Sequence, residues 1–464
     1  MASSRPPSPR VAFSTLGCKL NLYETDALAT RFQDGGYELV DSDEAADVYV
    51  INSCTVTNRA DRKSRNLLYR ALRQNDAEPG IVAGAPSGRR GLVILTGCYV
   101  DSHRDALESD GHTFVVPNEH KHAIFDLVEA HRRGEVMEPT GSVFDFPVPS
   151  RVFHTRTMIK VQDGCDNYCT FCIIPFVRGR AISRPATEVI DAVREAADGG
   201  AREVVLTGVN MSRYRDGDVR FSEIAQRVLD VDGDFRVRIS SLEPDQLDDR
   251  FIDLFDHPKM SPHLHLCAQS ASERILLAMG RQYTFSEYRD IALKLRARKP
   301  NFNLTTDIIV GFPGESDEEF GETLRAIDEL DFGHVHTFPY SERDGTRAVR
   351  MPGRIPERIR TERAATVREL AAAVKTRYRR RFIGATQRLL VERVEEDDDR
   401  LVLRGFGEHY VPIRVEFSAT AASVHGAPTS VPGTPAQNEF VDVQIVGIGE
   451  GENPVLEARL ISPP

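Results

Sequence analysis

The chain has 464 residues, enough for about three domains of ordinary size. Its hydrophobic fraction of 41% and charged fraction of 28% are those of a globular protein, so we do not expect long disordered segments. The net charge of −11 means that any contact with a nucleic acid must come from local basic patches. No apolar run reaches the ~18 residues that cross a bilayer, and the opening MASSRPPSPR lacks a signal-peptide core. We therefore expect a cytoplasmic protein that does not enter a membrane.

Short apolar runs alternate with helical patterns from residue 11 to about residue 117. Runs of this kind are typical of buried parallel strands joined by helices, so residues 10–140 are predicted to form an open parallel α/β domain. The four predicted strands are Val11–Leu16, Asp47–Asn52, Leu92–Thr96 and Thr113–Val116.

Cys18, Cys54 and Cys98 each follow one of these strands by one to three residues. Because the carboxyl ends of parallel strands share one edge of a sheet, these thiols can meet in space. A single such cysteine is more simply a small buried residue, but three equivalent positions favour a site. Three thiolates without an obvious fourth ligand suit zinc with an open position or an iron-sulfur cluster with one free iron. The spacing does not choose between them.

The alternation resumes at Thr157 after a linker that contains glycine and proline. Six successive β/α units with right-handed crossovers predict a partial (β/α)6 barrel within residues 150–382, with its chemistry at the carboxyl ends of the strands. The six predicted strands are Met158–Gln162, Glu203–Thr207, Phe235–Ser240, His263–Cys267, Leu304–Val310 and His334–Phe338.

Cys165, Cys169 and Cys172 follow the first of these strands in the spacing C-x3-C-x2-C. Such a loop can deliver three thiolates to a four-iron cluster and leave the fourth iron free to chelate a small molecule. A zinc site would need a second cysteine or histidine pair close by in the sequence, which is lacking. Phe171 either lies beside the open iron or packs within the loop.

Two basic runs and a strand-rich tail complete the chain. The run from Arg59 to Arg73 follows Cys54, and the run Lys375–Phe382 ends a predicted helix. Each is either a solvated helix surface or a phosphate-binding surface. Five short strand patterns in residues 383–464 predict a small β-barrel, a fold that often binds nucleic acid. Its 6 Arg and no Lys against 13 Asp and Glu do not favour strong phosphate binding.

The cysteine motifs resemble those of a known family. The extended loop Gly164–Pro175, followed by Arg178-Gly179-Arg180, is similar to that of the radical S-adenosylmethionine (SAM) methylthiotransferases. The segments around Cys18, Cys54 and Cys98 resemble the three cysteines that hold the auxiliary cluster in this family. The resemblance covers nearly the whole chain, with a weaker likeness of the tail to the TRAM β-barrel.

The resemblance implies an enzyme with two [4Fe-4S] clusters, one on each set of three cysteines, and two SAM molecules per turnover. One SAM chelates the open iron of the first cluster and is cleaved by one electron to a 5'-deoxyadenosyl radical. The second SAM methylates a sulfur held by the auxiliary cluster, and the methylthio group is joined to the substrate carbon. A one-electron reductant is needed, and the sulfur donor is not specified.

Other residues at the predicted strand ends are candidate SAM contacts. Glycines there would allow close backbone approach, and polar side chains could hydrogen-bond the amino or ribose groups of SAM, or could instead hold their own loops together. Cys267 is different, because we expect it inside the fourth barrel strand as a buried, unpaired thiol. The candidate contacts are Phe171, Gly208, Asn210, Glu243, Gln269 and Asp307.

The start Thr15-Leu16-Gly17-Cys18-Lys19 and the segment Cys54–Arg65 resemble the branch that acts on N6-threonylcarbamoyladenosine (t6A). The implied reaction adds a methylthio group to C2 of t6A at position 37, in the tRNA anticodon loop. A base in a single-stranded loop can be splayed into a barrel without breaking a duplex. The alternatives are N6-isopentenyladenosine in tRNA, an aspartate of ribosomal protein S12, or a non-enzymatic iron-sulfur or RNA-binding protein. We also expect a monomer.

Overall fold

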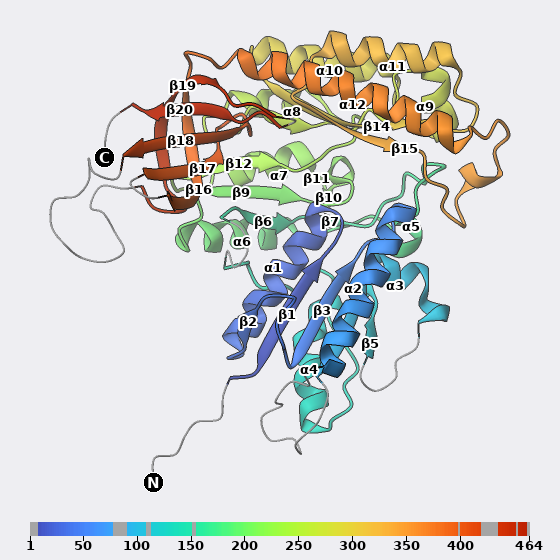
Figure 1. The fold of residues 1–464 in the computed structure, drawn as a ribbon, viewed down its shortest axis with the longest axis vertical. Helices are drawn as coiled ribbons and strands as arrows, with labels where there is room; N and C mark the ends of the chain where they lie inside the picture. Colours follow the sequence, from blue (N-terminus) through green and yellow to red (C-terminus); the bar gives the residue numbers. More distant parts are fainter. Residues whose placement is uncertain are drawn as a thin grey trace.

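The computed structural model describes residues 8–77, 91–107, 113–150, 155–397, 400–418, 435–451 and 453–461. The first seven residues, on which the prediction about a signal peptide partly depends, lie outside these ranges. Within them, no helix is both long and apolar enough to span a membrane. Figure 1 shows an N-terminal α/β layer below a larger barrel, with a small β-barrel beside the latter.

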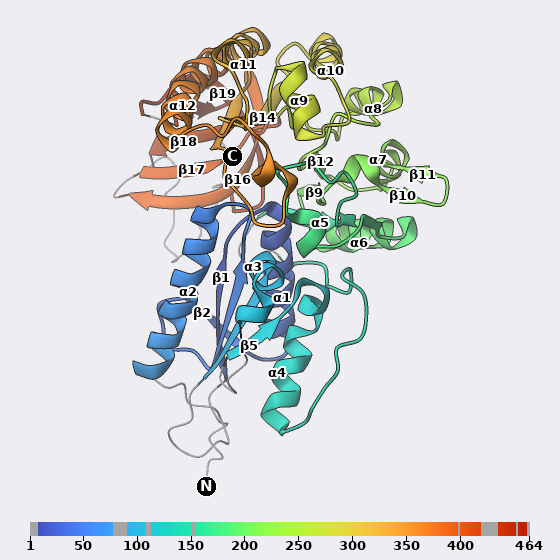
Figure 2. The same cartoon turned by 90° about the vertical axis from the view of Figure 1, so that its right-hand side faces the viewer.

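The N-terminal sheet is parallel and has the strand order β2-β1-β3-β4-β5. Figure 2 shows α1 and α4 on one side of the sheet and α2 on the other. Tyr99 and Val100 of α3 share a core cluster with the α2 residues Leu68 and Ala71. The predicted open parallel sheet is confirmed, and the three-residue edge strand β2 was missed. The elements are β1 (Arg10–Thr15), α1 (Lys19–Asp34), β2 (Glu38–Val40), β3 (Val48–Ser53), α2 (Asn58–Ala77), β4 (Leu92–Gly97), α3 (Cys98–Ser102), β5 (Thr113–Val116) and α4 (Ile124–Arg133).

The central domain has six parallel strands in two hydrogen-bonded groups, β12-β9-β6 and β13-β14-β15. Parallel bridges from Val237 to Met260 and from Leu242 to Leu266 connect the two groups, so the predicted partial barrel is confirmed. The strands are β6 (Thr157–Lys160), β9 (Glu203–Thr207), β12 (Arg236–Ile239), β13 (His263–His265), β14 (Asn303–Val310) and β15 (His334–Pro339).

Helices surround this barrel, and their apolar faces form one continuous core with the strands. Short strand pairs β7 (Gln162–Asp163) with β8 (Ile182–Ser183), and β10 (Arg215–Asp216) with β11 (Val219–Arg220), lie in the connecting loops. The helices are α5 (Ile174–Val177), α6 (Ala186–Asp198), α7 (Phe221–Leu229), α8 (Asp249–Asp253), α9 (Glu273–Met279), α10 (Phe285–Arg298), α11 (Asp317–Leu330) and α12 (Glu357–Arg380).

The C-terminal strands form a closed barrel in the order β16-β17-β18-β20-β19, which confirms the predicted small β-barrel. Its core includes Tyr378 and Phe382 from the end of α12 and the turn after it. The predicted domain limits at residues 140, 150 and 382 remain predictions. The strands are β16 (Thr386–Asp397), β17 (Arg400–Phe406), β18 (Pro412–Ser418), β19 (Phe440–Ile448) and β20 (Leu456–Leu460).

The basic run at the end of α12 is divided between buried and exposed cations. Lys375 is buried and donates to Asn453 Oδ1 at 2.6 Å, and Arg379 is buried and donates to the Pro454 carbonyl. Arg377 pairs with Asp331 of the neighbouring segment at 2.6 Å. Lys375 and Arg379 are therefore part of the seam between α12 and the C-terminal barrel, whereas Arg377, Arg380 and Arg381 are exposed on the helix surface.

Candidate active site

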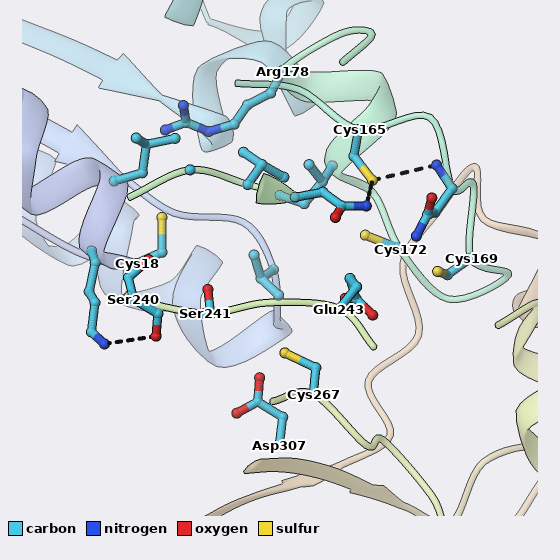
Figure 3. Close-up of a pocket in the computed structure, with 18 of the residues that line it drawn as sticks. Cys18, Cys165, Cys169, Cys172, Arg178, Ser240, Ser241, Glu243, Cys267 and Asp307 are labelled. Atoms are coloured by element: carbon cyan, nitrogen blue, oxygen red, sulfur yellow. Dashed lines mark hydrogen bonds between the residues drawn. The ribbon is translucent and has the colours of Figure 1, made fainter. Parts of the chain in front are cut away.

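A pocket of about 450 Å³ lies where the carboxyl edge of the N-terminal sheet faces the mouth of the central barrel (Figure 3). Its lining comes from both domains, because every strand that leads into it is parallel and ends there. The pocket collects all twelve residues predicted as site residues from the sequence. These are Cys18, Cys54, Cys98, Cys165, Cys169, Phe171, Cys172, Gly208, Asn210, Glu243, Gln269 and Asp307.

The loop with Cys165, Cys169 and Cys172 runs between β7 and α5. Gly164 begins it with a φ of +68°, and a Cβ at this position would lie 2.0 Å from the Arg180 carbonyl oxygen. Only glycine fits there without moving the backbone. The Thr170 N–H donates to the Met279 carbonyl at 2.8 Å, which fixes the loop to the end of α9.

Polar groups from several elements point at the sulfurs of this loop. The Asn210 side chain donates to Cys165 Sγ at 3.6 Å, and Arg281 Nη1 donates to Cys169 Sγ at 3.4 Å. Burial raises the pKa of the Cys172 thiol to about 12. A thiol in such a place becomes a thiolate only when a metal or another positive charge compensates it, which suits a buried metal ligand.

The second cysteine set is built from three separate strand ends. Cys18 immediately precedes α1, Cys54 directly follows β3, and Cys98 opens α3. Gly17 has a φ of +105°, and a Cβ on it would lie 3.1 Å from Cys54 Sγ, so its missing side chain lets the two loops approach. Asn118 Nδ2 donates to Cys98 Sγ at 3.7 Å.

The thiols of this second set influence one another electrostatically. Burial, followed by the neighbouring Cys98 and Cys18 thiols, raises the pKa of Cys54 to about 12. Burial likewise raises the pKa of Cys98. All seven cysteines of the chain are free of disulfides. Two sets of three soft thiol ligands in one pocket fit two iron-sulfur clusters, each with one iron not held by a cysteine.

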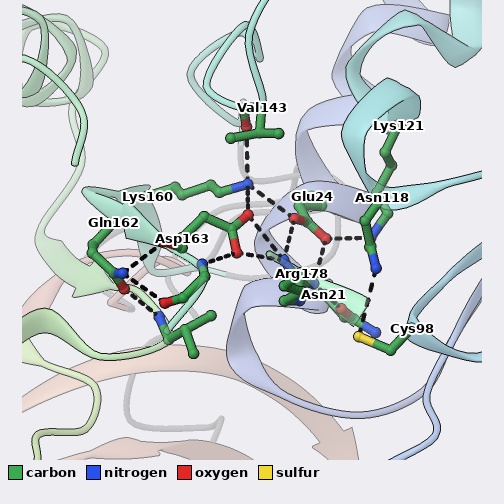
Figure 4. Close-up of polar contacts among 12 residues, drawn as sticks. Asn21, Glu24, Cys98, Asn118, Lys121, Val143, Lys160, Gln162, Asp163 and Arg178 are labelled. Carbon is green, nitrogen blue, oxygen red and sulfur yellow. Dashed lines mark hydrogen bonds and ion pairs between the residues drawn. The ribbon is translucent and has the colours of Figure 1, made fainter. Parts of the chain in front are cut away.

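A buried network of charged residues joins the two domains beside the pocket (Figure 4). Arg178 Nη1 lies 3.0 Å from Glu24 Oε1 and 3.1 Å from Asp163 Oδ2. Lys160 contacts both carboxylates, at 3.1 and 2.6 Å, and Lys121 contacts Glu24 at 2.5 Å. Since Glu24 is on α1 and Asp163 directly precedes the first cysteine loop, the network fixes one cysteine set relative to the other.

Several predicted SAM contacts already have partners within the protein. Glu243 forms an ion pair with Arg281, and Asp307 Oδ1 lies 3.3 Å from His265 Nε2. Gly208 is tightly packed, since a Cβ there would lie 2.7 Å from Met211 Cγ. Phe171 packs edge-on against Phe312, with ring centroids 6.4 Å apart. Their contact with SAM stays a prediction.

The structure corrects one position and adds residues that the sequence did not single out. Strand β13 ends at His265, so Cys267 lies after the strand and lines the pocket instead of being inside the strand. It is buried, as predicted, and its sulfur lies within 4.8 Å of ligand atoms of His265 and Asp307. Arg281 and His336 also line the pocket and were missed; His336 lies within β15, so a rule based on strand ends does not select it.

Comparison with known proteins identifies the class of the central domain. Residues 159–327 match the radical SAM superfamily, and residues 10–116 match the uncharacterized protein family UPF0004. The solved structure of the radical S-adenosylmethionine methyltransferase TsrM from Kitasatospora setae, with tryptophan and a SAM analog bound, aligns with a TM-score of 0.51. The alignment covers 71% of this chain and 73% of that chain at 15% identity, so the likeness concerns the fold. The central barrel is therefore a radical SAM domain.

Curated relatives specify the family within this class. The threonylcarbamoyladenosine tRNA methylthiotransferase MtaB of Bacillus subtilis is 36% identical over 87% of this chain and 89% of that protein. Its counterpart in Thermotoga maritima is 35% identical over 86% and 90%. The tRNA-2-methylthio-N(6)-dimethylallyladenosine synthase of Shewanella sp. (strain MR-4) is 30% identical over 95% and 90%. This chain belongs to the radical SAM methylthiotransferase family, which confirms the predicted enzyme class and its SAM and [4Fe-4S] cofactors.

Proposed function

We propose that this enzyme adds a methylthio group to C2 of t6A at position 37 of tRNA. One observation supports this most directly: two separate sets of three cysteines face each other across a single pocket. Methylthio transfer needs a radical at the substrate carbon and a sulfur held close to it, and two such sets can supply both. The relatives from Bacillus subtilis and Thermotoga maritima are named for this nucleoside, which supports its choice as substrate.

The residues of the chain then divide into two groups. Cys165, Cys169 and Cys172 would hold the cluster that supplies the 5'-deoxyadenosyl radical from SAM, and the other three cysteines would hold the auxiliary cluster that supplies sulfur. Arg281 and Asn210 aim N–H groups at sulfurs of the first set, and such donors stabilise the thiolate form.

The tRNA partner is supported by a surface on α2, which we call the α2 basic surface. All of the basic side chains that form it are exposed. Because α2 begins four residues after Cys54, the surface starts near the pocket. Arg59, Arg62 and Lys63 form no ion pair with any other described residue. Cations without protein partners are the groups that phosphates neutralise. The surface comprises Arg59, Arg62, Lys63, Arg65, Arg70 and Arg73.

The C-terminal barrel contrasts with this surface. Four of its arginines are held by carboxylates: Arg388 by Asp234, Arg400 by Glu416, Arg404 by Glu395, and Arg414 by Glu416 and Glu457. Phosphate would have to compete with these pairs. We infer that α2 provides more of the electrostatic attraction for tRNA than the barrel does, in a cytoplasmic monomer that takes electrons from a one-electron reductant.

The test uses the purified enzyme with its clusters reconstituted under anaerobic conditions, SAM and dithionite. Anticodon stem-loops with t6A or N6-isopentenyladenosine at position 37, and ribosomal protein S12, are offered in separate reactions, and products are measured by mass spectrometry. We expect the 2-methylthio derivative of t6A together with 5'-deoxyadenosine. Modification of the isopentenyl nucleoside or of S12, with t6A left unchanged, would refute the proposal.

A further inference from the structure

Lys19 is the first residue of α1 and follows Cys18 directly. Its side chain is half-buried and reaches the pocket at the wall that contains Ser240 and Ser241. The ammonium donates to the Ser240 carbonyl oxygen at 3.4 Å, the bond drawn at that wall in Figure 3. This distance is long for a hydrogen bond. Lys19 forms no ion pair with a residue in the described part of the chain.

The surroundings of Lys19 have an excess of positive charge. Its nitrogen lies 5.8 Å from the centre of the Tyr410 ring, and the guanidinium groups of Arg238 and Arg156 lie 3.8 and 5.3 Å from the same ring. The carboxylates nearby already have partners. Glu203 is bound by Arg236 at 2.7 Å and by Arg238 at 2.9 Å, Glu392 by Arg156 at 2.9 Å, and Asp307 lies 3.3 Å from His265.

These cations also affect a neighbouring phenol. Although burial raises the pKa of Tyr410, Arg238, Arg156 and Lys19 together lower it to about 8. A desolvated ammonium in such a positive environment is unfavourable unless an anion pairs with it. No described carboxylate does so, and the ammonium faces the pocket. The missing anion is therefore expected to come from a ligand.

The chemistry of t6A supplies such an anion. Its N6 substituent ends in the free carboxylate of a threonine, whereas an isopentenyl group is neutral and apolar. In adenine, C2 and C6 flank the ring nitrogen N1, and C6 bears N6, so the N6 substituent lies on the Watson–Crick side of the base near the reacting carbon. Lys19 is adjacent to Cys18 of the auxiliary set, where C2 would receive sulfur.

We propose that the Lys19 ammonium binds the threonyl carboxylate of t6A and thereby selects this nucleoside over adenosines with neutral N6 substituents. The inference rests on the proposed function and names the specificity-determining residue of that site. SAM has the other carboxylate that could enter the pocket, so the experiment has to separate the two sources.

The experiment combines a change in the protein with a change in the substrate. Wild-type enzyme and the Lys19→Met variant are given anticodon stem-loops that contain either t6A or its methyl ester, which removes the charge and keeps the remaining structure. For the wild type, kcat/KM should fall by about 10- to 100-fold on the ester, the range expected when a buried charge pair loses one partner. In Lys19→Met, kcat/KM on t6A should fall by a similar factor and should equal kcat/KM on the ester. Lys19→Arg should restore the preference for t6A over the ester.

Controls exclude a general defect. Lys294→Met removes a lysine of α10 that pairs with Asp249 on the surface, and it should keep both the activity and the preference. Iron content and 5'-deoxyadenosine formation without tRNA report whether the Lys19 variants fold and load clusters. If Lys19→Met fails to load clusters, Lys19→Gln, which keeps a hydrogen-bonding side chain without the charge, is compared on the same two substrates, and a wild-type preference retained in it would overturn the inference.

Two other results would also overturn the inference. One is an equal rate of the wild type on t6A and its ester. The other is an increase of KM for SAM in Lys19→Met with an unchanged KM for the stem-loop, which would assign Lys19 to the SAM carboxylate. If the wild type does not modify t6A at all, it is instead the proposed function that fails.

Discussion

The two cysteine sets consist of the same side chains, but their thiols are brought together in different ways. Cys165, Cys169 and Cys172 belong to one loop, whose shape is set by Gly164 and by contacts within its own domain. Cys18, Cys54 and Cys98 come from three loops, and only the parallel sheet brings them together. The first set therefore depends mainly on local sequence, whereas the second set depends on the tertiary fold and on its docking against the barrel.

The largest expected difference comes from removing one thiol of each set. Cys165→Ala should abolish SAM cleavage and all later steps, because it removes a ligand of the cluster that generates the radical. Cys54→Ala should leave 5'-deoxyadenosine formation intact and abolish sulfur insertion. Both are measured in one anaerobic reaction by mass spectrometry, with iron content as a loading control. An equal loss of both activities in the two variants would refute the division of labour.

A smaller effect is expected from loosening the docking between the sets. Burial raises the pKa of Glu24, but Arg178, Lys121 and Lys160 more than compensate and hold the pKa well below 4.5. Glu24→Gln leaves these buried cations short of one carboxylate and should lower the free energy of unfolding of the apoprotein by about 3 kcal/mol at pH 7. Sulfur insertion should fall more than SAM cleavage.

The stability contributed by Glu24 should depend on pH in a definite direction. A carboxyl group whose pKa is depressed by folding stabilises the protein above its unfolded pKa, and this contribution is lost as the pH falls below about 4.5 toward the folded value. The stability difference between wild type and Glu24→Gln should therefore shrink on acidification in urea titrations. A difference that stays constant from pH 7 to pH 3 would contradict the network's role. Glu188→Gln, which affects a solvent-exposed pair with Arg184, is the matched control and should cost less than about 1 kcal/mol.

The smallest effect is expected at the α2 basic surface, beside the set that is built by the fold. Arg62→Ala should weaken stem-loop binding a few-fold and reduce the salt dependence of log Kd by about one unit, as for one lost phosphate contact. SAM cleavage without tRNA should not change. Arg325→Ala removes an exposed arginine of α11 and is the control. An unchanged salt slope in Arg62→Ala would indicate that tRNA does not contact this surface.

The twelve pocket residues could be predicted from the sequence for two reasons. The spacing C-x3-C-x2-C identifies a ligand loop, and the carboxyl ends of neighbouring parallel strands lie at one edge of a sheet. The sequence did not predict partners that the fold brings from far away. Arg281 donates to Cys169 across 112 residues, and Arg178 meets Glu24 across 154. The burial of Lys375 and Arg379 in α12 was equally unpredictable, because it depends on how the C-terminal barrel packs against that helix.

The charges of the buried network at the domain interface do not balance. Lys121, Lys160 and Arg178 are three cations, while Glu24 and Asp163 are two anions, so one positive charge is left over in a buried place. Arg178 and Lys121 both act to lower the pKa of the neighbouring Cys98 thiol, against the effect of burial. When a metal takes up Cys98 as a thiolate, the surplus charge gains its counterion. Electroneutrality thus links the charge of the auxiliary centre to the buried cations that hold the two domains together.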